Sequence, residues 1–79
     1  MKTETAIDRL STIGPPRTTN GGHSYYADRD GWRASFINQG DRALCLRASY
    51  GDHDWHFMTM KQLVHFVLSR RPGFAEQRP

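Results

Sequence analysis

Four short segments between Ser24 and Met58 alternate polar and apolar side chains, and three turn signals separate them. A period of two is typical of β-strands with one buried face, because successive side chains point to opposite sides of a sheet. The expected strands are Ser24–Ala27, Trp32–Ile37, Arg42–Tyr50 and Trp55–Met58. The intervening DRDG, NQGD and GDHD are short enough for hairpin turns, so the pattern predicts a four-stranded antiparallel meander.

A first helix is expected near the N-terminus, in ETAIDRLSTI. Its apolar face comprises Ala6, Ile7, Leu10 and Ile13. Thr3 or Thr5 can cap its start, and the GPP that follows ends it, because Gly adopts the left-handed conformation and Pro cannot continue a helix. Residues 15–23 are dense in Pro, Gly, Asn and Thr, which predicts a flexible loop.

A second helix is expected from Thr59 through KQLVHFVLSRR. Thr59 and Gln62 have the spacing of a capping box, and Met58 is placed to pack on Leu63 as a hydrophobic staple. The apolar arc of this helix is wide, so much of its circumference is expected to be buried. Pro72-Gly73 ends it, and residues 74–79 are expected to be a frayed tail.

These elements predict one small α+β domain over residues 1–79, in the order α-β-β-β-β-α, with both helices on one face of the sheet. The alternation assigns to the core Trp32, Ala34, Phe36, Leu44, Leu46, Ala48, Tyr50, Trp55 and Phe57. It assigns to the opposite face Arg33, Ser35, Ile37, Cys45, Arg47, Ser49, His56 and Met58.

The composition restricts the compartment and the partners. The chain has one cysteine, no N-terminal apolar segment of the kind found in signal peptides, and no apolar run long enough to cross a bilayer. A cytoplasmic protein is therefore expected. Its net charge is +3, with nine arginines and two lysines. Arginine suits phosphate and carboxylate recognition, but a GC-rich coding sequence also enriches arginine, so the charge permits nucleic-acid binding without requiring it.

The segment YGDHDWHF concentrates two histidines and two aspartates, which raises the question of a metal site. His53 and His56 are three residues apart, and this spacing sends them to opposite faces of a strand. A hairpin turn followed by a strand explains the segment better. Cys45 with His56 lacks a third group to orient the imidazole. We expect no catalytic residues, no metal site and no cofactor, and hence no enzyme.

Two binding functions remain open at this point. The candidate surface is the uncovered sheet face with Arg33, Arg47 and His56, and with Tyr25, Tyr26, Arg29 and Arg42 at its margins. Arg and Tyr commonly anchor protein interfaces, and the sheet edges can also pair with a partner. Basic side chains interleaved with aromatics can instead bind single-stranded nucleic acid, although no RNP-like motif is present. We favour a protein partner, with nucleic acid second and neither membrane nor small-molecule substrate.

A short meander over Tyr25–Met58, a terminal helix over Thr59–Arg71 and the absence of a catalytic motif resemble the small anti-CRISPR proteins of phages and mobile elements. The resemblance implies a non-enzymatic inhibitor in the cytoplasm of a bacterial host. It implies binding to a subunit of a multi-subunit (type I) CRISPR surveillance complex, which would block target-DNA access. Many such inhibitors are acidic DNA mimics, and this basic chain departs from that pattern, so adhesion to the effector is expected instead. No site residue carries over from the resemblance.

Overall fold

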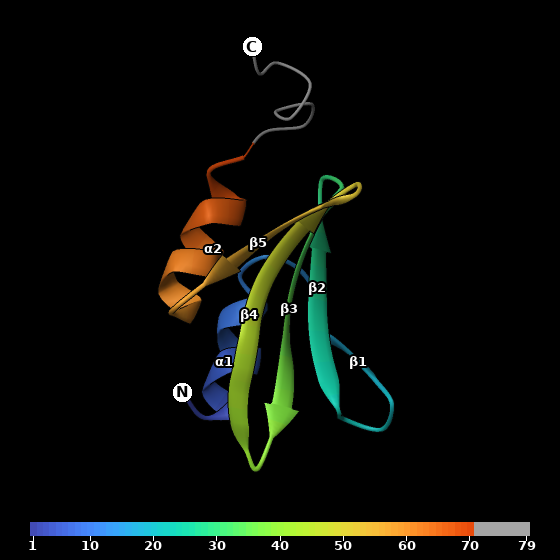
Figure 1. Ribbon diagram of the computed structural model, residues 1–79, viewed down its shortest axis with the longest axis vertical. Helices are drawn as coiled ribbons and strands as arrows, with labels where there is room; N and C mark the ends of the chain where they lie inside the picture. Colours follow the sequence, from blue (N-terminus) through green and yellow to red (C-terminus); the bar gives the residue numbers. More distant parts are fainter. Residues whose placement is uncertain (71–79) are drawn as a thin grey trace.

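The computed structural model describes residues 1–70 and shows an α+β fold with an antiparallel sheet and two helices (Figure 1). The helices are α1 (Thr3–Leu10) and α2 (Met60–Leu68). The strands are β1 (Arg17–Thr19), β2 (Ser24–Arg29), β3 (Trp32–Gln39), β4 (Arg42–Tyr50) and β5 (His53–Phe57), and they neighbour one another in chain order. The second helix ends at Leu68 with Ser69 as its C-cap, so the prediction that it continues to Arg71 was wrong. The expected tail over residues 74–79 lies outside the described residues.

The sheet has five strands, and the prediction of four was wrong. The additional strand, β1, lies within the segment expected to be a flexible loop. It pairs with β2, and Thr18 is the register partner of Tyr25. β1 has only three residues, all exposed, so its sequence cannot show the alternation of buried and exposed side chains that identifies a strand. Its pairing with β2 is what makes it a strand.

The meander is held by three tight turns, Asp30-Gly31, Gly40-Asp41 and Gly51-Asp52. Asp30, Asp41 and the glycines have positive φ, which suits the primed turns that join twisted strands. The strands extend further into the turn sequences than expected. In particular, β5 begins at His53, which had been assigned to the turn.

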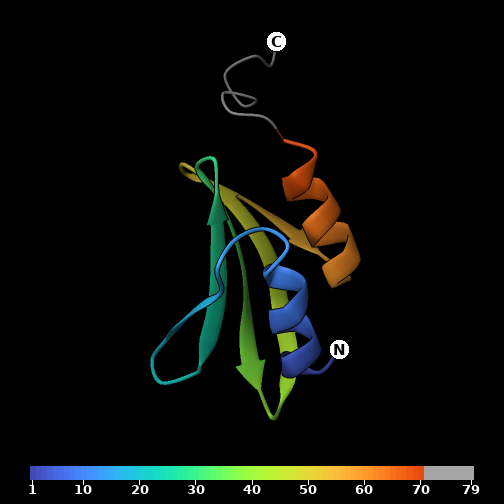
Figure 2. The same cartoon turned by 180° about the vertical axis from the view of Figure 1, so that it is seen from behind.

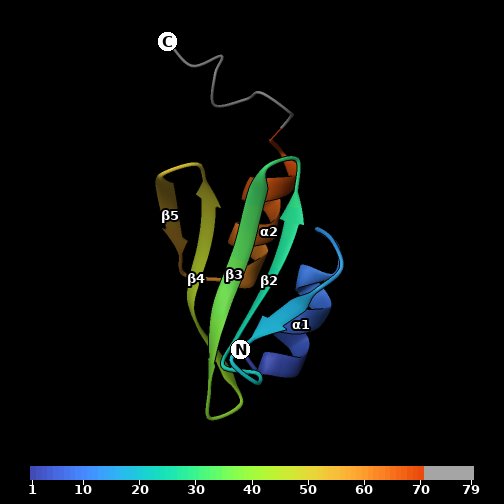
Figure 3. The ribbon, with the colours of Figure 1, turned by 90° about the vertical axis from the view of Figure 1, so that its right-hand side faces the viewer.

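Both helices cover one face of the sheet, as predicted, and the opposite face is left open (Figures 2 and 3). Trp32 is the centre of the core, at 2% exposure. Its ring lies 4.7 Å from that of Tyr50, 5.2 Å from that of Trp55 and 5.4 Å from that of Phe66 on α2. The core thus joins the sheet to α2 through aromatic contacts, as expected when large rings are buried together.

The start of α2 confirms the predicted capping box. The Thr59 hydroxyl accepts a hydrogen bond from the Gln62 backbone N–H, and the Gln62 side chain accepts one from the Thr59 N–H. The predicted staple was wrong, because Met58 is 89% exposed and does not pack on Leu63. The chain enters the helix at an angle that directs Met58 into solvent.

The start of α1 is fixed by the sheet. Lys2 is the N-cap residue and makes no side-chain cap, so the prediction of a Thr3 or Thr5 cap was wrong. The Thr3 hydroxyl instead donates to Asn38 Oδ1 at 2.5 Å, and the Thr3 backbone N–H donates to the Asp41 carbonyl at 2.8 Å. A β-bridge between Lys2 and Arg42 also anchors the first residues of the chain to β4.

A β-bulge in β4 changes the predicted core. Ser35 pairs with Arg47, but Ile37 pairs with Leu44, so β4 contains one extra residue opposite Phe36. Cys45 has φ of 55° and supplies that residue. Leu44 is consequently exposed at 42%, not buried as predicted, and its neighbour Ala43 is in the core.

Candidate binding surface

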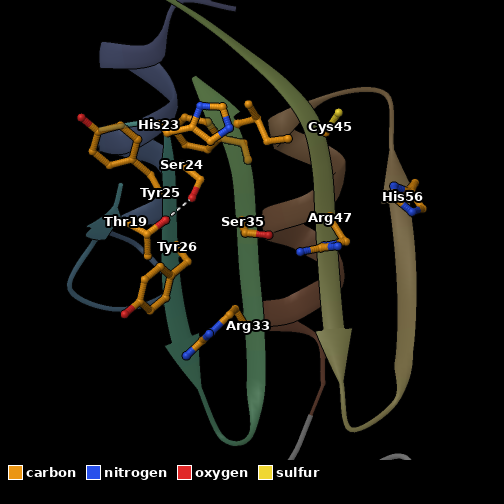
Figure 4. Close-up of a pocket in the computed structure, with 12 residues that line it drawn as sticks. Thr19, His23, Ser24, Tyr25, Tyr26, Arg33, Ser35, Cys45, Arg47 and His56 are labelled. Atoms are coloured by element: carbon orange, nitrogen blue, oxygen red, sulfur yellow. Dashed lines mark hydrogen bonds between the residues drawn. The ribbon is translucent and has the colours of Figure 1, made fainter. Parts of the chain in front are cut away.

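The sheet face that the helices leave uncovered, here called the open face, is the candidate functional surface. It is formed by alternate residues of all five strands, including Tyr26 of β2, Arg33 and Ser35 of β3, and Arg47 of β4. Figure 4 shows these side chains side by side across the strands, with the helices behind. The strands hold the side chains at fixed register, so the surface is largely preformed.

Arg33 is held by two neighbours on β2. Its Nε and Nη2 donate to the two carboxylate oxygens of Asp28 at 2.7 and 3.1 Å. Its guanidinium carbon lies 4.2 Å from the centroid of the Tyr26 ring, in cation–π geometry. The hydrogen bond from Arg33 lowers the pKa of Asp28 below its ordinary value, and Asp28 in turn raises the pKa of Arg33. Arg33 is thus oriented and charge-neutralised within the fold.

Arg47 has a looser arrangement of the same kind. Its Nη1 lies 3.8 Å from a carboxylate oxygen of Asp54 on β5, and both side chains are about half exposed. His56 is the direct cross-strand partner of Arg47. Each of the two arginines that the alternation predicted for this face therefore has a carboxylate on an adjacent strand.

The middle of the open face is uncharged. Ile37 and Leu44 are register partners across β3 and β4, beside Cys45 and Ser35. Ile37 had been assigned to this face but not to the site, and Leu44 had been assigned to the core. The signal for this apolar centre was the run Ala43–Leu46, in which four consecutive apolar residues break the alternation.

A depression of about 510 Å³ runs across the open face toward its β1 side. It is bordered by Thr19, His23, Ser24, Tyr25, Tyr26, Arg33, Ser35, Phe36, Ile37, Cys45, Arg47 and His56. Its walls combine an apolar floor with arginine and histidine at the rim, which suits an inserted side chain of a partner.

The predicted site residues fall into two groups. Arg33, Arg47, His56 and Tyr26 lie together on the open face. Of the remaining three, Tyr25 and Arg29 point to the helix side, whereas Arg42 lies on the open face beside the β3–β4 turn, away from the other four.

Tyr25 points to the helix side, where its ring stacks on Phe36 with centroids 5.5 Å apart, although it also borders the depression. Arg29 is the register partner of Trp32, on the helix side, and lies 3.8 Å from Asp30. Arg42 pairs with Gln39 at the opposite end of the β3–β4 hairpin from Arg33.

The two histidines of YGDHDWHF lie on opposite sides of the sheet, as predicted, and Cys45 and His56 both border the depression. His53 lies on the helix side, with its ring 6.0 Å from that of Trp55, whereas Asp54 and His56 share the open face. Within residues 1–70, no group of three or more His, Cys, Asp or Glu side chains could hold a metal ion. Cys45 is exposed at the bulge.

No family model, curated protein or solved structure matches this chain. Among the described residues, neither helix has the length and apolar character that a bilayer crossing requires.

Proposed function

We propose that the chain is a stoichiometric protein-binding module that uses the open face as its interface. The observation that carries the proposal is the charge arrangement. Arg33 is neutralised by Asp28, and Arg47 lies near Asp54. The uncharged pair Ile37 and Leu44 lies between the Ser35–Arg47 pair and the Gln39–Arg42 pair. An uncharged centre with a paired polar rim is the arrangement of protein–protein interfaces.

Nucleic-acid binding receives less support from the same contacts. A phosphate backbone is recognised by cations that are free to replace counterions, and the two central arginines already have carboxylate neighbours. Base stacking needs accessible aromatic rings, and Arg33 occupies one face of the Tyr26 ring. Single-stranded nucleic acid is therefore the second candidate.

The specific partner that we propose follows from the resemblance to anti-CRISPR proteins: a subunit of a type I CRISPR surveillance complex in a bacterial cytoplasm. Binding without turnover would prevent the complex from reaching target DNA. The module needs only a preformed surface for this role, which the rigid register of the sheet supports.

The decisive experiment expresses the full chain in a bacterium whose type I complex targets a phage, and measures plaque formation. The wild-type chain is expected to restore plaques, and tagged chain is expected to retain effector subunits after nuclease treatment. Leu44→Lys should abolish both effects, whereas Met58→Lys, a matched change at an exposed residue outside the sheet, should leave both intact.

Two results would contradict the proposal. Retention of nucleic acid alone, or loss of all retention on nuclease treatment, would promote the nucleic-acid function. Unaltered effector binding by a folded Leu44→Lys variant would exclude the open face as the interface.

A further inference from the structure

The outer edge of β5 is a free sheet edge within the described part of the chain. β5 is the last strand in the sheet order and pairs only with β4. Figure 3 shows it at the margin of the sheet, with α2 behind the strands and not beside this edge. The opposite edge strand, β1, has three residues, whereas β5 offers five, His53–Phe57. Exposed edges of this kind pair readily with another strand.

The hairpin before β5 decides which backbone groups face outward. A two-residue turn, Gly51-Asp52, joins Tyr50 to His53, and these two residues are register partners. In such hairpins the flanking residues exchange both backbone hydrogen bonds. His53 therefore directs its N–H and C=O toward β4, and by alternation Asp54 and His56 direct theirs toward the free edge.

A two-fold pairing of this edge with its own copy allows few registers. For the two β5 strands to be antiparallel in one continuous sheet, the two-fold axis must be perpendicular to that sheet. One residue of β5 then lies directly opposite the same residue of the other copy, with the axis between them. Centring on Asp54 would oppose two carboxylates, and centring on His56 would oppose two imidazoles. Centring on Trp55 places Asp54 of each copy opposite His56 of the other, and it uses all of β5.

We propose that a second copy of this chain binds the β5 edge antiparallel, in the register centred on Trp55. The two-fold symmetry produces two equivalent cross-strand pairs, each between Asp54 of one copy and His56 of the other. An imidazole N–H can donate to a carboxylate whether the imidazole is neutral or protonated. Asp54 is available for this contact, since Arg47 approaches it only to 3.8 Å.

The helix side of the edge supports the same register. Trp55 and Phe57 are half-buried at this edge, against Phe66 of α2. In the pairing, Trp55 meets its copy at a non-hydrogen-bonded position, where Cα atoms are about 4.5 Å apart. The pairing would therefore cover apolar surface on the side where each chain already has its core. The inference does not depend on the open face having a protein partner.

The test is sedimentation of the full chain from about 1 μM to about 1 mM, a range that spans weak strand-edge association. Wild type is expected to convert from the monomer mass to twice that mass within this range. Asp54→Arg and His56→Asp should each shift the midpoint to concentrations at least about tenfold higher. The first places a guanidinium opposite the imidazole, where neither side offers the carboxylate acceptor, and the second places two carboxylates opposite each other.

Mixing the two variants is the sharper measurement. In a mixed dimer the introduced arginine faces the introduced aspartate, and the native His56 faces the native Asp54, so association should return to wild-type strength or better. Both sites are exposed, and circular dichroism verifies folding. A chain that stays monomeric throughout, or a dimer that neither variant weakens, or a mixture that fails to associate, would overturn the proposal.

Discussion

Ile37 and Leu44 face each other across β3 and β4 on the open face, next to the bulge at Cys45. This pair has no core role, because Leu44 is 42% exposed and Ile37 points away from the helices. A large aliphatic pair on an exposed strand surface adds little to folding when half of it stays in water. Its exposure is the reason for proposing it as the anchor of a partner.

The first prediction concerns the distribution of binding energy over the open face. Once a partner is captured, Leu44→Ala should weaken affinity about tenfold or more, as truncation of a central anchor does. Arg33→Gln and Arg47→Gln should weaken it less, because rim charges mainly affect association rate and salt dependence. Titration calorimetry at low and high salt measures both effects. If affinity instead fell steeply with salt while Leu44→Ala left it unchanged, the binding would be mainly electrostatic.

The bulge yields a stability prediction at Cys45. A non-glycine residue with φ of 55° is held in the left-handed region, at a cost of about 1 kcal/mol. Cys45→Gly should therefore stabilise the fold by about 0.5 kcal/mol, after allowing for the entropy that glycine loses on folding. Cys45→Val should destabilise it by more than about 1 kcal/mol, since β-branched side chains tolerate this conformation poorly. Urea denaturation measures the free energy of unfolding of the two variants and the wild type. A Cys45→Val variant as stable as wild type would contradict the bulge geometry.

The core prediction is made at Trp32, which is 2% exposed and contacts aromatic rings from β4, β5 and α2. Trp32→Ala should cost about 3–5 kcal/mol, a large part of the total stability of a domain this small. Trp32→Phe should cost less than half of that, because it keeps a ring and removes an indole N–H that has no partner among the described residues. Thermal unfolding by circular dichroism compares the two variants. Trp55→Ala, at the half-buried sheet edge, serves as the milder control.

The fourth prediction is a pH dependence from Asp28 and Arg33. Arg33 lowers the pKa of Asp28 below 3.8, so the folded state releases this proton more readily than the unfolded chain. The stabilisation is thus fully present above about pH 4 and is lost as pH falls through the lowered pKa. Both side chains are about half exposed, so the pair contributes under about 1 kcal/mol.

The measurement is denaturant unfolding between about pH 2 and pH 7. Asp28→Asn should be less stable than wild type at neutral pH, and the difference should vanish in acid. Asp8→Asn, at an exposed carboxylate on α1 outside the ion pairs described above, is the matched control. A difference that persists unchanged at the lowest pH would show that Asp28 acts through packing and not through its charge.

Much of the fold follows from local patterns in the chain. The alternation through Trp32, Ala34 and Phe36 placed β3 with its correct face toward the helices. Thr59 and Gln62 correctly predicted the start of α2, because a capping box involves only residues within one helical turn. Arg33, Arg47 and His56 followed from the same alternation, and all three lie on the open face.

Other features depend on contacts between distant residues. β1 forms only because β2 offers an edge for pairing, and the cap of α1 is lost because Thr3 finds Asn38 across the fold. Tyr25 and Arg29 were predicted at the margin of the candidate surface but point to the helix side, because the register of the strand decides the direction of each side chain.

By itself, the sequence determined the antiparallel meander, the terminal helices and the inward face of β3, since each rests on interactions between near neighbours. The tertiary structure decided the number of strands and the apolar centre of the open face. A single extra residue at Cys45 reverses the alternation on one side of the bulge, which moves Ala43 into the core and Leu44 onto the open face. The apolar run Ala43–Leu46 marks a break in the alternation, but it does not say which of its residues turns inward. That depends on what packs against the strand, here Phe36 under the helices.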